Sequence, residues 1–215
     1  MRRTFLPILL LLALPGVSNS QEYATDPFLL GVGARALGMG SAYAAVSDDV
    51  TALYWNAAGL VQIERSEVQA QHAEQYGGTV NHDFVVIGFP STLGAFGIGL
   101  VRLAVDGIAL SRLEDPSRPL GPDNRPISQG TVGTSDYTLS AGYSRAWREN
   151  LSFGAAVKLI WRNLEIGNGT GYGIDVGLHY RHCTRWRIGA VIRDITRTRI
   201  TYDSGTRDTI RPSLM

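Results

Sequence analysis

The stretch GVGARALGMGSAYAAVSDDVTALYWNAAGL, residues 31–60, differs in composition from the rest of the chain. It is dense in glycine and alanine and contains two adjacent carboxylates, Asp48 and Asp49. Behind it, apolar residues recur at every second position, which is typical of β-strands. We therefore expect residues 21–64 to form a small N-terminal plug with short helices, called the plug segment below. Residues 65–215 should form β-strands around it.

Four runs in the C-terminal half alternate between apolar residues and polar or small ones. They cover residues 137–147, 151–162, 171–181 and 186–193. Each run has roughly the ten residues that a tilted transmembrane strand requires. The pattern predicts an all-β fold, namely a transmembrane antiparallel β-barrel of an outer membrane. A soluble β-sandwich is the alternative, because its strands also alternate.

Three earlier runs are less regular. Phe84–Phe89 is apolar on both faces, so we expect its inner face to be buried against the plug segment. In Ala95–Val105 the alternation slips between Leu100 and Leu103, which predicts a β-bulge there. Glu67–Ala73 is a weakly patterned strand.

The connections between the expected strands differ in length. Short connections lie at 90–94, 148–150 and 183–185, and they alternate with longer ones at 74–81, 106–134, 165–170 and 196–211. Strict alternation of this kind is typical of outer-membrane barrels, which have tight periplasmic turns and longer external loops. Four prolines between Pro116 and Pro126 predict that 106–134 is a loop.

Aromatic residues lie near both ends of the expected strands, where they would form two membrane girdles. The set beside the short turns is Trp147, Phe153, Tyr180 and Trp186, and the set beside the longer loops is Tyr137, Trp161 and Tyr172.

The opposite face of the same strands predicts the lining of the barrel. Its glycines leave room for an approaching backbone: Gly142, Gly154, Gly173, Gly177 and Gly189. Its polar side chains make a basic lumen with one counter-charge: Lys158, Arg181, Arg187 and Arg193, with Asp175. A wide barrel with only these small residues inside would be hollow, so we expect the plug segment to fill it.

The first residues have the pattern of a secretory signal peptide. Met1–Arg3 is basic, Phe5–Leu14 is apolar, and Ser18–Ser20 offers small residues for cleavage, which predicts a signal peptide over 1–20. The apolar run is too short for a membrane-spanning helix, which needs roughly 20 residues. We therefore expect export and localisation in the outer membrane of a Gram-negative-type bacterium.

The composition limits the possible partners. The chain of 215 residues has a formal net charge of +1, which argues against nucleic-acid binding driven by charge. Its single cysteine, Cys183, excludes an internal disulfide and a cysteine-based zinc site. No catalytic residue, metal or cofactor is expected.

Several shorter motifs favour structural roles. The glycines at 31, 33, 38 and 40 lack the spacing of a nucleotide-binding loop. His179 and His182 would face opposite sides of a strand, which argues against a metal site. No nucleophile elbow supports a serine hydrolase. Ser47 is expected to cap a helix over 50–55, with Asp48 and Asp49 in its first turn and paired with the basic lumen.

Three pieces of the plug segment resemble a known signature. GARALGMG (33–40), AVSDD (45–49) and LYWNAAGL (53–60) are similar to the N-terminal signature of the PorV/PorQ family, a branch of the FadL-like outer-membrane barrels. Ala57 stands where that family commonly has proline, and Ser41 stands where glycine is common. The residues that carry the resemblance are Gly33, Arg35, Gly38, Met39, Gly40, Asp48, Asp49, Tyr54, Trp55, Asn56, Gly59 and Leu60.

The resemblance implies a barrel of about fourteen strands with its N-terminal segment inside. About seven to eight strands are expected here, and the chain lacks a terminal aromatic residue, so we expect a truncated half-barrel with an open, curved sheet. The resemblance also implies a non-enzymatic role in type IX-like protein secretion, with secretion components, exported cargo proteins and outer-membrane lipid as partners. The alternative is a FadL-like channel for hydrophobic compounds such as long-chain fatty acids. The small, basic inner face favours the secretion role.

Overall fold

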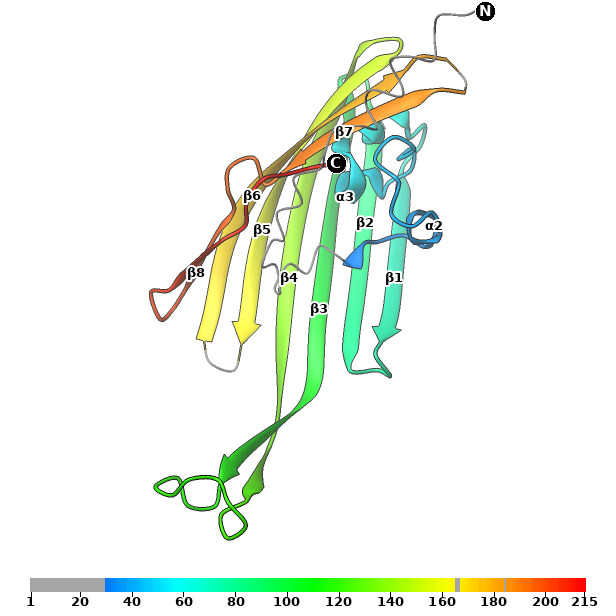
Figure 1. The fold of residues 1–215 in the computed structure, drawn as a ribbon. Helices are drawn as coiled ribbons and strands as arrows, with labels where there is room; N and C mark the ends of the chain where they lie inside the picture. Colours follow the sequence, from blue (N-terminus) through cyan, green and yellow to red (C-terminus); the bar gives the residue numbers. More distant parts are fainter. Residues whose placement is uncertain (1–29, 165–166, 184) are drawn as a thin grey trace, which may run out of the picture.

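The computed structural model describes residues 30–164, 167–183 and 185–215. These residues form one large antiparallel sheet of ten strands with a few short helices, and the sheet does not close into a barrel (Figure 1). The expected open sheet is therefore confirmed. The predicted signal peptide and residues 21–29 of the plug segment lie outside the described residues. No helix in the described ranges has the length and apolar character needed to cross a membrane.

Strands β1 to β7 follow one another across the sheet in chain order, and β10 extends the sheet beyond β7. Strand β8 pairs with β6 and β9. The bounds are β1 Glu67–Gln75, β2 Val80–Ser91, β3 Gly94–Leu113, β4 Pro126–Arg148, β5 Leu151–Leu164, β6 Gly167–Arg181, β7 Arg187–Arg193, β8 Arg199–Tyr202, β9 Arg207–Thr209 and β10 Ser213–Leu214. The seven expected strand regions are confirmed, and the three short C-terminal strands are additional.

The hairpin of β3 and β4 is longer than predicted. Most of the expected loop at 106–134 is strand, and only residues 114–125 connect β3 to β4. Pro126 is tolerated because it is the first residue of β4, where no ladder hydrogen bond is lost. The predicted bulge at Leu100–Leu103 was also wrong. The register is continuous there and shifts instead between Val105 and Ile108, beside Gly107 at φ 72°.

The predicted strict alternation of short and long connections was wrong as well. The connection between β1 and β2 shortens to 76–79, and the one between β5 and β6 to 165–166, which lies outside the described residues. Pairing continues into polar positions such as Asn163 with Asn168, because ladder hydrogen bonds need no apolar side chain. The expected loop at 196–211 contains the β8–β9 hairpin.

Three short helices form the described part of the plug segment. They are α2 (Ala34–Gly38), α3 (Ala52–Trp55) and a 3₁₀ helix, η2 (Ala57–Gln62). The expected helix over 50–55 begins later than predicted, with Thr51 rather than Ser47 at its cap. Ser47 is fully buried, and its carbonyl accepts a hydrogen bond from the Gln62 side chain at 3.0 Å, so it belongs to the packing of the segment.

The plug segment packs on one face of the sheet (Figure 1). The core combines its apolar side chains with inward residues of β2 and β3, such as Phe84 and Val86, which are 4% and 1% exposed. Val85 and Ile87, on the other face of β2, are 46% and 42% exposed. The inner face of Phe84–Phe89 is therefore buried against the plug segment, as predicted, and the outer face is not.

Candidate functional site

The interface between the plug segment and the inner face of the sheet is the candidate site. Two predicted inward glycines lie where the plug segment meets the sheet. A β-carbon at Gly154 would lie 2.4 Å from the Ala58 nitrogen, and one at Gly177 would lie 2.1 Å from Asn56 Oδ1. Only a residue without a side chain permits this approach.

Asn56 joins the plug segment to the sheet through its buried side chain. Its Nδ2 donates to the Ala44 carbonyl at 2.8 Å and to the Leu178 carbonyl of β6 at 3.1 Å. Its Oδ1 accepts from the Ala58 nitrogen at 3.1 Å, which starts η2. The side chain thus satisfies backbone groups on both sides of the interface.

Three inward polar side chains that sequence reasoning did not select complete this contact. Ser144 Oγ and Ser152 Oγ both donate to the Ala58 carbonyl, at 3.1 and 2.8 Å. His179 Nε2 lies 3.0 Å from the Ala45 carbonyl. All three are buried. The alternation placed them on the inner face, but nothing in the sequence indicated which plug carbonyl each would meet.

The aromatic pair of the motif lies beside a sheet arginine. Trp55 is 3% exposed, and its Nε1 donates to the Val32 carbonyl at 2.8 Å. The Arg193 guanidinium lies 4.9 Å from the Tyr54 ring centre, and its Nη2 donates to the Tyr54 carbonyl at 3.1 Å. This combines a cation–π contact with a hydrogen bond.

Asp48 links two arginines, one in the plug segment and one in the sheet. Its carboxylate oxygens lie 2.6 Å from Arg35 Nη1 and 3.2 Å from Arg187 Nη1 of β7. Burial raises the pKa of Asp48, but the two guanidinium groups outweigh burial, so that this pKa lies below its ordinary value. The expected ion pair with a basic inward residue is therefore present.

Asp49 has a local role. Its Oδ1 accepts from the Thr51 nitrogen at 2.9 Å and from the Thr51 hydroxyl, and its Oδ2 accepts from the Tyr43 hydroxyl at 2.7 Å. Burial and this bond raise the pKa of Tyr43. Asp49 Oδ2 also lies 3.8 Å from Arg35 Nη1, so the two carboxylates share Arg35, but the ion pair with the sheet is made by Asp48. Neither carboxylate lies in the first turn of a helix.

The remaining motif residues have packing or turn positions. Leu60 is fully buried, and Gly59 lies against the Ser47 carbonyl. Gly33 and Gly40 have φ of 82° and 64°, and Gly33 nitrogen donates to Gln71 Oε1 of β1 at 2.7 Å. Gly38 ends α2, and Met39 is 43% exposed.

A buried charge network lies on the inner face beyond the plug segment. Lys158 Nζ is 2.9 Å from Asp175 Oδ1 and 2.8 Å from Asp194 Oδ1. Asp194, which the sequence did not single out, also accepts from the Thr198 hydroxyl at 2.5 Å. Arg162 pairs in the same region with Asp136 at 3.1 Å. Charges buried at these depths require such partners.

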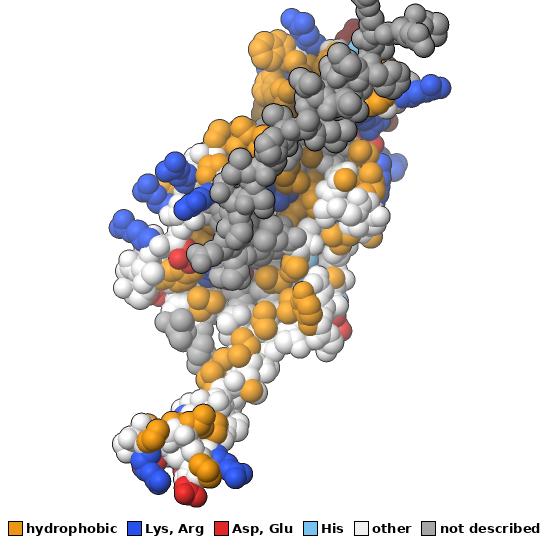
Figure 2. Space-filling view, viewed as in Figure 1, with side chains coloured by type: hydrophobic (Ala, Val, Ile, Leu, Met, Phe, Trp, Pro, Cys, Tyr) orange, Lys and Arg blue, Asp and Glu red, His pale blue; other side chains and the backbone are white. Residues whose placement is uncertain are grey.

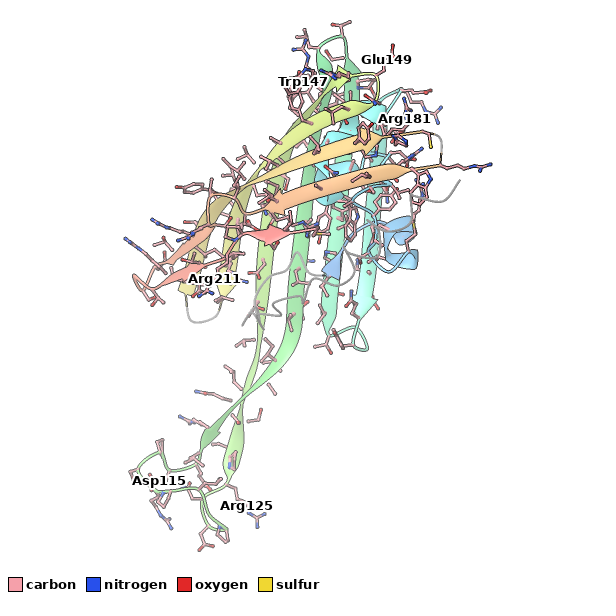
Figure 3. The ribbon with its side chains drawn as sticks, turned by 45° about the horizontal axis from the view of Figure 1, so that its top comes forward. Asp115, Arg125, Trp147, Glu149, Arg181 and Arg211 are labelled. Atoms are coloured by element: carbon pink, nitrogen blue, oxygen red, sulfur yellow. The ribbon has the colours of Figure 1, made fainter. Side chains whose placement is uncertain are left out.

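A cleft of about 530 Å³ lies between the plug segment and the strand ends at 149–150. Its lining carries both signs of charge, from Asp48, Glu64, Arg148, Glu149 and Arg181. Arg181, predicted to face the lumen, is exposed at this rim and donates to the Glu149 carbonyl at 3.3 Å (Figure 3).

The middle of the outward face is apolar from β2 to β6. One row of register partners is Val85, Leu100, Leu139, Leu159 and Tyr172, and the next is Ile87, Ile98, Ala141, Val157 and Ile174. A third is Phe89, Phe96, Tyr143, Ala155, Val176 and Ile192. Large members such as Ile98, Val157 and Leu159 are 47%, 48% and 42% exposed, so no described residue covers them.

Polar and aromatic residues border these rows. The next register row toward the 165–166 end carries His72, Asp83, Arg102, Tyr137 and Trp161. In this row the Asp83 carboxylate lies 2.6 Å from His72 Nδ1 and 2.8 Å from Arg102 Nη1. At the 149–150 end, Trp147 is 71% exposed and meets Phe153 edge-on at 6.2 Å. Trp186 and Tyr172 are 65% and 62% exposed, and Tyr180 is half-buried.

Within the described ranges, no group of three or more His, Cys, Asp or Glu side chains is placed to hold a metal ion. Comparisons of the chain with protein-family models, with curated proteins and with solved structures gave no match. The case for a function therefore depends on the chemistry of the two faces.

Proposed function

We propose that this chain is a non-enzymatic outer-membrane protein of the PorV/PorQ type, that β1–β7 cross the membrane as part of a barrel, and that it acts in protein secretion. The observation that carries the proposal is the outward face. From β2 to β6, three successive register rows present only apolar or aromatic side chains, and charges return in the bordering rows and on β8, where Arg199 pairs with Tyr172. An exposed apolar surface of this extent is unfavourable in water and suits acyl chains.

The inner face supports the same proposal. Its buried ion pairs and small residues are typical of a barrel interior, in which polar groups lie inside and apolar groups outside. In a soluble sandwich the apolar face would be covered by a second sheet. The proposal requires that the free edges at β1 and β10 pair with further strands, because open edges are not tolerated in lipid.

Secretion is favoured over uptake of hydrophobic compounds by the cleft at the 149–150 end. Its lining combines charged and polar residues, including Arg148, Glu149 and Asn150, with apolar ones such as Val61 and Leu151. A mixed lining of this kind suits an extended polypeptide better than an acyl chain. The described plug segment packs on the inner face from β2 to β6.

Deleting the gene in the source bacterium and measuring secreted proteins and fatty-acid uptake side by side tests the role. We expect loss of secretion with normal uptake, and restoration by the wild-type gene. Loss of uptake with normal secretion would favour the channel instead.

A further inference from the structure

We infer that a groove on the outward face, at the edge formed by β5, β6, β8 and β9, binds the phosphate group of an anionic membrane lipid. The inference depends on the proposed function, because it requires the outward face to lie in a membrane. The groove has a volume of about 470 Å³. Its lining combines apolar, aromatic and basic side chains, among them Leu159, Trp161, Tyr172, Arg199, Thr201 and Arg207.

The register places both arginines on the outward face. Arg199 pairs with the outward Tyr172, and Arg207 pairs with Thr201. Ile200 lies between them in register and points to the inner face, where it is 2% exposed. Arg199 and Arg207 are therefore diagonal neighbours across β8 and β9, and such positions lie about 7–8 Å apart.

The nearby carboxylates are engaged elsewhere. Asp208 accepts from the Tyr202 hydroxyl at 2.9 Å, and Asp203 accepts from the Asn168 nitrogen at 3.3 Å. Neither Arg199 nor Arg207 has an ion pair or side-chain hydrogen bond with a residue of the described ranges. Figure 2 shows Lys and Arg side chains along the margin where β8 lies in Figure 1. Two adjacent guanidinium groups that have no counter-charge among the described residues offer planar, multidentate donors to a phosphate.

The position of the groove favours a lipid over free phosphate. Leu159 belongs to the first apolar row, whereas Trp161 belongs to the border row that contains Asp83 and Arg102. A lipid can therefore place its phosphate between the arginines while its acyl chains lie along Leu159 and Val157. Trp161 in the border row, and Tyr172 beside Arg199 at the end of the first row, present exposed rings next to the arginines, and aromatic side chains of this kind prefer the headgroup region.

The test compares the double variant Arg199→Gln/Arg207→Gln with the matched control Arg112→Gln/Arg118→Gln. The control removes the same charge from exposed arginines near the tip of the β3–β4 hairpin. The full chain is purified in detergent, and its affinity for phosphatidic acid relative to phosphatidylcholine is measured by native mass spectrometry. We expect the groove variant to lose this preference by a factor on the order of ten, while the control keeps it.

An unchanged preference in the groove variant, or an equal loss in both variants, would overturn the inference. Inorganic phosphate is added in a parallel series, and binding of free phosphate as tight as that of the lipid would overturn the assignment to a lipid. Flotation of the wild type with neutral phosphatidylcholine vesicles tests the proposed function separately. Failure to float would contradict both proposals, whereas flotation without a phosphatidic-acid preference would contradict only this one.

Discussion

Asn56 shows how one side chain holds the plug segment on the sheet. It satisfies the Ala44 and Leu178 carbonyls and the Ala58 nitrogen, and it is 1% exposed. Buried backbone groups that lose such a partner cost free energy, since water cannot replace it.

We expect Asn56→Ala to lower the free energy of unfolding by about 2–3 kcal/mol, because it leaves buried polar groups without partners. Urea titration of the full chain in detergent measures this. Asn168→Ala, at an exposed position of β6, serves as the control and should change the free energy of unfolding by less than about 0.5 kcal/mol. Equal effects of the two substitutions would contradict the assigned role.

Asp48 makes the stability of the folded chain depend on pH through its ion pairs with Arg35 and Arg187. Its pKa is lowered in the folded state, so its stabilisation is complete above the unfolded value of about 3.9 and is lost as the pH falls through the lower folded value. The difference in stability between wild type and Asp48→Asn should therefore be at most about 1 kcal/mol at neutral pH and vanish in acid. Unfolding titrations at several pH values measure it, and a difference that grows toward low pH would be inconsistent with this account.

At the scale of elements, β5 and η2 form a close backbone contact between sheet and plug segment. Gly154 faces the backbone of η2, and Ser152, two residues earlier on the same face, donates to the Ala58 carbonyl. A glycine and a small hydroxyl residue thus let a helix lie directly on a strand.

Gly154→Ala should lower the free energy of unfolding by about 1–3 kcal/mol, since the added methyl group would overlap the η2 backbone. Gly121→Ala is the matched control, because a β-carbon there meets nothing within 4 Å. Thermal unfolding of both variants in detergent provides the comparison. A neutral result for Gly154→Ala would mean that the segment does not pack there.

Much of the sheet could be predicted from the sequence, because alternation of side chains follows directly from strand geometry. The alternation identified the inward glycines and the inward Lys158 and Asp175. The long β3–β4 hairpin was not predictable in this way: polar residues such as Ser128 and Thr131 pair in a ladder without an apolar pattern. Nor was the start of α3, where Asp49 bonds Thr51 locally instead of joining the helix.

Of the two carboxylates that pair with the buried Lys158, only one could be predicted from the sequence. Asp175 lies on a regular strand, so its face followed from alternation. Asp194 lies just beyond β7 with a φ of 54°, so no strand period could place it against Lys158.

At the scale of the whole molecule, the sheet has its charges and small residues on the face that holds the plug segment and its large apolar residues on the exposed face. The β3–β4 hairpin extends beyond the sheet at one end, and Figure 3 shows Asp115 and Arg125 at its tip, far from Glu149 and Arg181 at the other end. Under the proposed function, the membrane would cross the middle of the strands and the hairpin tip would lie in water.

Spin-label accessibility tests that claim most directly. Single nitroxides are attached at Ile98, Val157 and Leu159 on the outward face and at Arg112 and Ser128 on the hairpin, in a Cys183→Ser background of the full chain in lipid vesicles. We predict that the three outward positions collide with oxygen and not with a water-soluble nickel chelate, and that the hairpin positions show the reverse. Equal nickel accessibility at both sets of positions would contradict the account.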